Sequence, residues 1–287
     1  AEIYEKQGSP KDKLTGCYDC LGLGLYNSGE YQKSLDLALK TLAIREKILP
    51  ADHPDMATSY HNLSADYGQL GEYQKQLDFI LKALAIREKV LPADHLDLAM
   101  TYQNLGWAYR NLGEHSKALE FHSKGLFIYE KTLQANDHSL ALSYLHQGII
   151  YEKLAEFQKS TEFILKAINI QEKVSPPDPY LASSYSEMAV VYGRLGYYKK
   201  QLEFNLKALS IQEKKELSAA DSLELATICN NISNSYDHIG EDQKALEFML
   251  KAVAIYENVL PVGHPYLATT YNNLAGRYGN LGEYQKA

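Results

Sequence analysis

Residues 86–117 have the sequence IREKVLPADHLDLAMTYQNLGWAYRNLGEHSK, and this stretch decides the fold. In its middle, aromatic, leucine and small residues stand at offsets of 0, 3, 4 and 7, which places them on one face of an α-helix: Tyr102, Leu105, Gly106 and Tyr109. Pro92 ends the helix before this one, and Gly113 marks a turn after it. The stretch therefore predicts two helices joined by a loop, with a third helix starting after Gly113.

The same pattern recurs along the whole chain. IREK at 44–47 and 86–89 returns as IYEK, IQEK, IQEK and IYEN at 128–131, 170–173, 211–214 and 255–258, in steps of 42, 42, 42, 41 and 44. A fixed period of this length is typical of stacked structural units, each of which buries its apolar face against the next. We predict an all-α array with a remnant of a preceding unit at 1–14, six units at approximately 15–56, 57–98, 99–140, 141–181, 182–225 and 226–267, and a partial unit at 268–287.

Positions within a unit are counted here from the turn residue, for example Gly71 or Gly113. Position −7 carries only Gly, Ser or Ala, and position +12 only Thr, Ala or Gly, so we expect the two helices of a unit to approach closely there. The second helix ends with Lys or Arg, which suits the negative end of its macrodipole. In the loop at 49–55, Asp52 and Pro54 are the expected cap and first-turn residues of the next helix.

Composition narrows the function classes. The 287 residues carry a net charge of −7 and are 45% hydrophobic, as in an ordinary globular protein. A mildly acidic chain is a poor partner for nucleic acid, and no apolar run is long enough to span a membrane. Three cysteines are too few for a disulfide framework and favour a reducing, cytoplasmic location.

The stretch Tyr102-x2-Leu105-Gly106-x2-Tyr109 resembles the tetratricopeptide helix–turn–helix signature, with Tyr in place of the usual Trp. The 42-residue period is similar to that of the kinesin-light-chain type of repeat. The resemblance implies a right-handed superhelical solenoid of antiparallel helix pairs. In this family the first helix of each pair lines a concave groove that holds a peptide or protein segment. The chain starts and stops within the motif, so we expect it to be the recognition part of a larger protein.

With positions −11, −8, −7 and −4 in the core, positions −10, −9, −6 and −3 are expected to face the groove. The candidate residues on this stripe, with Arg194 one place further on, are His61, Asn62, Gln103, Asn104, Trp107, Arg110, His146, Glu187, Arg194, Asn230, Asn231, Asn234, Asn272 and Asn273. An Asn amide can bond a peptide backbone, or it can bond a neighbouring helix and stabilise stacking. Trp107 and Arg110 are of the types enriched at binding hot spots, although Trp107 alternatively packs against the next repeat.

Catalytic, metal and cofactor sites are not expected. Cys17 and Cys20 form a C-x-x-C string without two further zinc ligands nearby, and an all-helical array lacks the context of a redox motif. His53, His95 and His264 lie in inter-repeat loops, where they are expected to cap helices. Tetratricopeptide domains that clamp the carboxylate end of heat-shock proteins use Lys at position −10, and no unit has it. That specificity is excluded.

Two other functions stay open beside a non-enzymatic peptide-binding scaffold. The array could be a structural spacer or oligomerisation element, stacking end to end through the face of Tyr271, Leu274 and Tyr278. Alternatively, it could sense a ligand for an attached signalling ATPase or protease.

Overall fold

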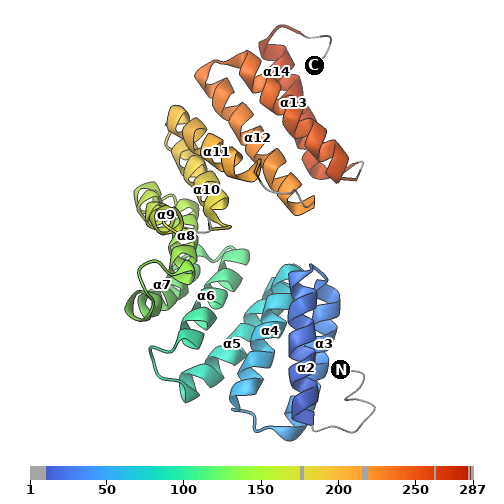
Figure 1. Cartoon of the computed structure of the whole chain (residues 1–287), viewed down its shortest axis with the longest axis vertical. Coiled ribbons are helices and arrows are strands. Elements are labelled where there is room, and N and C mark those ends of the chain that lie inside the picture. Colours follow the sequence, from blue (N-terminus) through green and yellow to red (C-terminus); the bar gives the residue numbers. More distant parts are fainter. Residues whose placement is uncertain (1–10, 175–177, 215–218, 262, 284, 286–287) are drawn as a thin grey trace. The chain divides into compact units, whose positions relative to one another are not determined.

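The computed structural model describes residues 11–174, 178–214, 219–261, 263–283 and 285. Within these ranges all regular secondary structure is α-helical (Figure 1). The helices are α2 (Lys11–Asn27), α3 (Tyr31–Ile48), α4 (Pro54–Gln69), α5 (Tyr73–Val90), α6 (Leu96–Asn111), α7 (His115–Thr132), α8 (His138–Lys153), α9 (Phe157–Gln171), α10 (Leu181–Arg194), α11 (Tyr198–Gln212), α12 (Ala219–Ile239), α13 (Asp242–Val259) and α14 (Pro265–Asn280).

The helices form two compact units, Ala1–Leu154 and Ala155–Ala287. In the N-terminal unit the pairs α2/α3, α4/α5 and α6/α7 pack internally, and each second helix also contacts the first helix that follows it. The C-terminal unit repeats this arrangement from α9 to α14. The predicted all-α stack of helix pairs is confirmed. The first helices begin slightly before the predicted unit boundaries, because the boundaries followed the sequence period and not the helix caps. Most of the predicted remnant at 1–14 lies outside the described residues.

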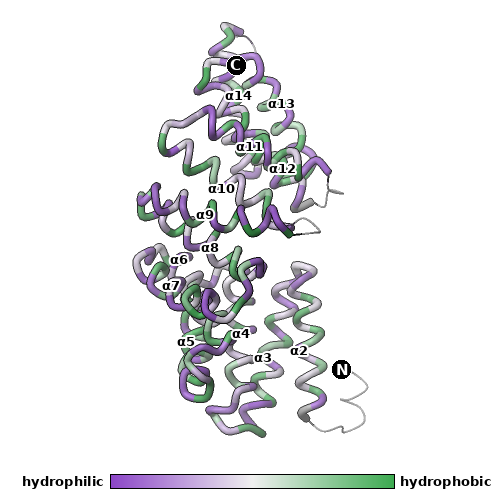
Figure 2. Tube along the Cα trace, turned by 60° about the vertical axis from the view of Figure 1, so that its left-hand side comes forward, coloured by the Kyte–Doolittle hydropathy of each residue, from purple (hydrophilic) through white to green (hydrophobic). Residues whose placement is uncertain are grey.

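The core follows the predicted spacing. At position −8, side chains from both units are fully buried: Leu63, Leu105, Met188 and Ile232. Burying each of them stabilises the fold by about 1.5–3 kcal/mol. Every helix also carries hydrophilic residues, as the mixed colouring of each turn shows (Figure 2). Two predicted core positions are instead exposed, Leu21 on α2 and Tyr271 on α14, because no helix of the described structure covers them.

Small residues at position −7 let the paired helices touch, as expected. Ser64 Oγ donates a hydrogen bond of 2.9 Å to the backbone oxygen of Gln76, and Ser233 Oγ donates one of 2.7 Å to that of Ala245. A larger side chain at either serine would separate the helices and remove this hydrogen bond between them.

Histidines cap the first helices, as the sequence indicated. The Nδ1 atoms of His53, His95 and His264 accept hydrogen bonds of 3.1, 3.1 and 3.2 Å from the backbone N–H two residues later. Asp52 is not the cap that we expected. Its carboxylate accepts a hydrogen bond of 2.5 Å from Lys89 Nζ, because the imidazole of His53 already fills the cap position. Pro54 is the first helical residue, as predicted.

The turn that joins the two helices of each pair requires a left-handed backbone. Six of the seven turn positions carry Gly, with φ between 75° and 82°. The seventh is Ala155, at φ 58°, where its Cβ makes the same conformation cost about 1–2 kcal/mol.

Candidate binding face on the first helices

In each of the two compact units, the first helices of successive helix pairs form a continuous face. α4 and α6 contact each other directly. Across them, His61 Nε2 lies 3.2 Å from the side-chain amide of Asn104. The matching positions of α12 and α14 are joined by a 3.3 Å hydrogen bond from Asn273 Nδ2 to Asn230 Oδ1. We call the surface formed by α2, α4, α6 and α8 the first-helix face of the N-terminal unit.

Several of the candidate asparagines bond to neighbouring helices. Besides the Asn230–Asn273 and His61–Asn104 contacts, Asn234 Oδ1 accepts a hydrogen bond of 2.7 Å from Arg277 Nη2. The other terminal nitrogen of Arg277 lies 2.5 Å from Asp237 Oδ2, so the guanidinium ties α14 to α12. Of the two roles left open by the sequence, these residues fill the stacking role.

Three candidate asparagines have side-chain amides that make no hydrogen bond with any described residue: Asn62, Asn231 and Asn272. Asn62 and Asn231 are half-buried and Asn272 is exposed. These amides keep both a donor and an acceptor for another chain.

Trp107 packs against the next repeat, which is one of the two roles considered for it, and part of its ring stays open to solvent. Its ring meets the ring of His146 on α8 edge-on, with 4.7 Å between the centroids. The guanidinium carbon of Arg110 lies 3.7 Å from the centre of the indole, a cation–π contact worth about 0.5–2 kcal/mol. All three side chains are half-buried, so the indole packs on the next repeat and still meets solvent.

Gln103 was expected on the open surface, but its side chain is buried. Its side chain is 7% exposed, and its Nε2 donates hydrogen bonds to Ser143 Oγ at 2.6 Å and to the backbone oxygen of His122 at 3.2 Å. Gln103 Oε1 accepts from Nδ1 of His122, a fully buried residue at a position where neighbouring units have Ile. Gly106 makes room, since a Cβ there would lie 2.3 Å from His122 Cδ2. A histidine in the core has drawn Gln103 inward.

The histidines near this face are held neutral. Burial, with the nearby charge of Arg87, lowers the pKa of His61 to about 4. Burial and Arg110 likewise lower the pKa of His146 to about 4. Complete burial takes the pKa of His122 well below its usual value. At neutral pH none of the three imidazoles supplies a positive charge.

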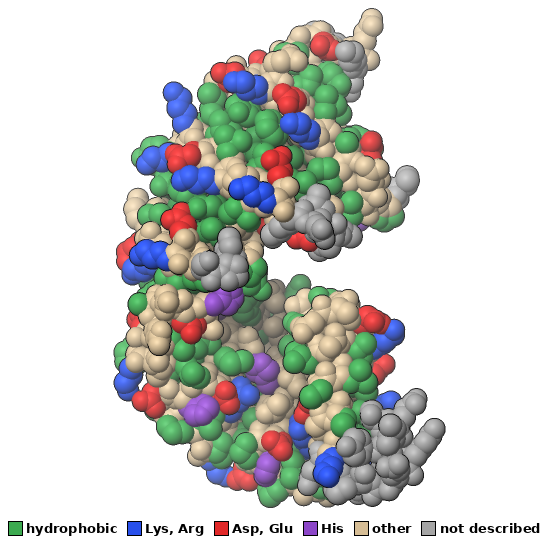
Figure 3. All heavy atoms as spheres, in the orientation of Figure 1, with side chains coloured by type: hydrophobic (Ala, Val, Ile, Leu, Met, Phe, Trp, Pro, Cys, Tyr) green, Lys and Arg blue, Asp and Glu red, His purple; other side chains and the backbone are tan. Residues whose placement is uncertain are grey.

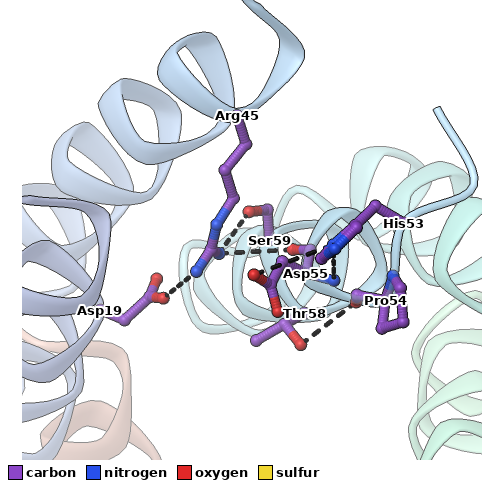
Figure 4. Close-up of polar contacts among 7 residues, drawn as sticks. All are labelled: Asp19, Arg45, His53, Pro54, Asp55, Thr58 and Ser59. Carbon is purple, nitrogen blue, oxygen red and sulfur yellow. Dashed lines mark hydrogen bonds and ion pairs between the residues drawn. The ribbon is translucent and has the colours of Figure 1, made fainter. Parts of the chain in front are cut away.

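Arg45 faces inward, although its place near the end of the second helix indicates only an interaction with the helix macrodipole. From α3 it reaches Asp19 on α2, with 2.6 Å between Nη2 and Oδ2 (Figure 4). Its Nη1 donates to Ser59 Oγ at 2.8 Å and to the backbone oxygen of Asp55 at 3.3 Å. Burial raises the pKa of Asp19, and the Arg45 guanidinium opposes that rise.

Arg87 repeats this arrangement one unit later without the carboxylate. Its Nη1 donates to Thr101 Oγ1 at 2.6 Å and to the backbone oxygen of Asp97 at 3.3 Å, and it lies 3.4 Å from His61 Nδ1. His61 takes the place of Asp19. The signal that could have revealed both sites is a pairing of residues 26 apart, Asp19 with Arg45 and His61 with Arg87.

The remaining candidates lie on the C-terminal unit. Glu187 is half-buried on α10, and Arg194 is exposed at the end of that helix. Among the described residues, no group of three or more His, Cys, Asp or Glu side chains is arranged to hold a metal ion. None of the described helices combines the length and apolar character needed to cross a bilayer.

Comparisons with known proteins agree with this architecture. Models of the tetratricopeptide repeat match residues 14–89 and 77–131, 141–174, and 225–266. The chain therefore belongs to the tetratricopeptide-repeat proteins, and it is a repeat scaffold. Among curated proteins, none matches the sequence.

Solved structures show the same fold at low sequence identity. A kinesin light chain from Podosopora anserina with nearly identical tetratricopeptide-like repeats is 24% identical, with a TM-score of 0.61 over 73% of this chain and 99% of that one. The apo quorum sensor NprR from B. thuringiensis is 19% identical, with a TM-score of 0.76 over 99% and 76%. A signal transduction ATPase from Pyrococcus horikoshii with a tetratricopeptide repeat sensor is 19% identical, with a TM-score of 0.71 over 96% and 42%.

Proposed function

We propose that this chain is a non-enzymatic scaffold whose first-helix face in the N-terminal unit binds a peptide or protein segment in extended conformation. The observation that carries the proposal is a set of half-buried side chains on three successive first helices of this unit: Asn62 on α4, Trp107 and Arg110 on α6, and His146 on α8. The set contains an amide with no internal partner and an aromatic ring that is only partly covered. Such a set can bond a peptide backbone and also bury a side chain.

The surface charge of the chain supports a soluble partner that carries charges of both signs, and its cysteines bear on its location. On the face shown in Figure 3, Lys and Arg side chains alternate with Asp and Glu. That pattern does not favour a polyanion such as nucleic acid. The free thiols of Cys17, Cys20 and Cys229 support the cytoplasmic location expected from the sequence.

The experiment is a peptide-array screen on the purified chain, followed by titration of each hit against the fluorescence of Trp107, the only Trp. Hits that change this fluorescence and compete with one another support the proposal. Asn62→Ala should weaken the hits, because the amide has no internal partner to lose. Asn273→Ala, which breaks only the bond to Asn230, is the matched control. A folded protein that binds no peptide, or whose hits are indifferent to Asn62→Ala, contradicts the proposal.

Self-association is a second candidate function, favoured by exposed apolar side chains on α2 and α14. Leu23 is 62% exposed and Tyr271 is 45% exposed. If these faces stack between copies, light scattering should rise with protein concentration, and Leu23→Ser should abolish the rise. A mass that stays monomeric at all concentrations removes this candidate.

A sensing role, as in the signal transduction ATPase of similar fold, would use the same first-helix face. Peptide binding alone does not separate it from the scaffold.

A further inference from the structure

Arg87 is a buried cation with no anion beside it. Its side chain is 8% exposed, and its hydrogen bonds all leave from Nη1 to neutral groups: a threonine hydroxyl, a backbone carbonyl and an imidazole. Burial lowers the pKa of Arg87, and the negative charge of Asp97 opposes this change. The two side chains form no ion pair among the described residues. A charge buried this way is costly unless a counter-charge reaches it.

The first repeat shows what fits there. Arg45 has the same surroundings as Arg87, with a hydroxyl and a carbonyl at matching distances on Nη1. The difference is on Nη2, which holds the carboxylate of Asp19 at 2.6 Å. Nη2 of Arg87 bonds nothing among the described residues, and it is not sealed from solvent.

His61 leaves this nitrogen open. A guanidinium has no lone pair, so His61 Nδ1 must accept from Arg87, and the single proton of the neutral ring sits on Nε2. The Asn104 amide can accept that proton only through its oxygen, so it turns Oδ1 toward the ring in place of Nδ2, which lies 3.2 Å from Nε2. The ring therefore fills the space of Asp19 without supplying its charge. Asn62 follows His61 directly in the sequence, and its amide is also without a partner among the described residues.

We propose that Arg87, with His61 and Asn104 around it, is a recognition site for a carboxylate of the bound segment, the side chain of a Glu or Asp. This proposal rests on the proposed function and names the ligand group. The incoming carboxylate takes on Nη2 the place that Asp19 takes in the first repeat. It differs from a clamp built on lysines of the first helices, because the cation comes from the second helix, α5.

The test uses the full chain and the peptide hits, each synthesised with Glu, Gln or phosphoserine at every acidic position and with an amidated C-terminus. Binding is measured by fluorescence anisotropy of the labelled peptide. We expect Glu to be preferred over Gln by about tenfold in Kd, the worth of one charge-assisted hydrogen bond. The preference should vanish in Arg87→Gln. That variant is expected to fold, because Gln171 and Gln212 occupy the same position in later repeats and are fully buried.

Two further variants sharpen the result. Lys89→Gln removes one positive charge from the same helix, but Lys89 points to Asp52, so the preference should survive. His61→Asp places the missing carboxylate inside the protein. It should therefore abolish the Glu preference and raise the thermal midpoint of the chain, whether or not a peptide is present.

The outcomes separate the two proposals. Peptides that bind without any Glu preference overturn the carboxylate site and leave the proposed function intact. Stronger binding of phosphoserine than of Glu assigns the site to phosphate and overturns it as well. No binding of any peptide overturns both proposals. A thermal midpoint that does not rise in His61→Asp overturns the claim that Arg87 lacks a counter-charge.

Discussion

The face of α4 and α6 and the face of α12 and α14 use the same positions in different ways. On α12 and α14 the contacts between the two first helices join Asn230 to Asn273 and Arg277 to both Asn234 and Asp237. The amides of Asn231 and Asn272 on the same helices make no hydrogen bond with any described residue. On α4 and α6, His61 and Asn104 meet, but Arg87 lacks a carboxylate and Asn62 has no partner.

The difference teaches that residue type at a repeat position does not decide its role. Asn230, Asn234 and Asn273 bond a neighbouring first helix, whereas Asn62, Asn231 and Asn272 bond nothing among the described residues. The feature that separates the N-terminal unit is Arg87, which has no carboxylate beside it, and this is why the proposed function is assigned to that unit.

Acid should produce the largest contrast between the two units. The folded pKa values of His61 and His146 are about 4, below the usual 6.5, and that of His122 is lower still. Because the unfolded chain takes up these protons first, stability is full above pH 6.5 and falls as the pH drops toward 4. Burial raises the pKa of Asp66 to about 6, which opposes part of this loss. We expect a net loss on the order of a few kcal/mol in the N-terminal unit.

Hydrogen exchange at pH 7 and pH 5, resolved by unit, measures this loss. The double variant Gln103→Leu/His122→Ile should remove part of the acid sensitivity. Leu145 and Ile164 occupy the equivalent positions one helix pair later, so these side chains are compatible with the fold. Equal loss of protection in both units would show that the buried histidines are not its cause.

Gly106→Ala should have the next largest effect. Its Cβ would collide with the buried ring of His122, and overpacking of this kind costs about 1–3 kcal/mol. Gly276→Ala on α14 meets nothing within 4 Å and should be neutral or stabilising, because Ala favours helix. Urea unfolding of both variants compares the tightly packed surroundings of Gly106 with the open surroundings of Gly276. Similar midpoints would refute the packing that we describe around His122.

Removal of each arginine should separate the two faces further. Arg277→Ala removes the hydrogen bond to Asn234 and the ion pair of Asp237, which keeps its hydrogen bond from Asn280. The loss should cost about 1–3 kcal/mol. Arg87→Gln removes a charge that has no counter-charge and should change stability by less than about 1 kcal/mol. Thermal unfolding measures both. A larger loss in Arg87→Gln than in Arg277→Ala would show that Arg87 is already well paired.

The turn at Ala155, which joins α8 to α9, should give the smallest effect. Ala155→Gly relieves the left-handed backbone at φ 58° and should stabilise by about 0.5–1 kcal/mol, measured by thermal unfolding. Gly113→Ala makes the reverse change at φ 77° and should destabilise. A lower midpoint for Ala155→Gly would indicate that the Ala155 methyl group makes a stabilising contact.

Much of the fold could be predicted from the sequence because it depends on local spacing. The helices, the small position −7 and the histidine caps follow from residues within a few turns of each other. The pairing of side chains across helices could not be predicted in this way. It depends on the offset between neighbouring first helices, which joins residues 43 apart, and on substitutions such as His122 that redirect Gln103 inward.

The most direct test of the account is hydrogen exchange of the chain with and without a peptide hit, compared between α4–α6 and α12–α14. New protection is expected on α4 and α6, around Asn62 and Trp107, with little change on α12 and α14. Protection centred on α12 and α14, or on the second helices of either unit, would contradict it.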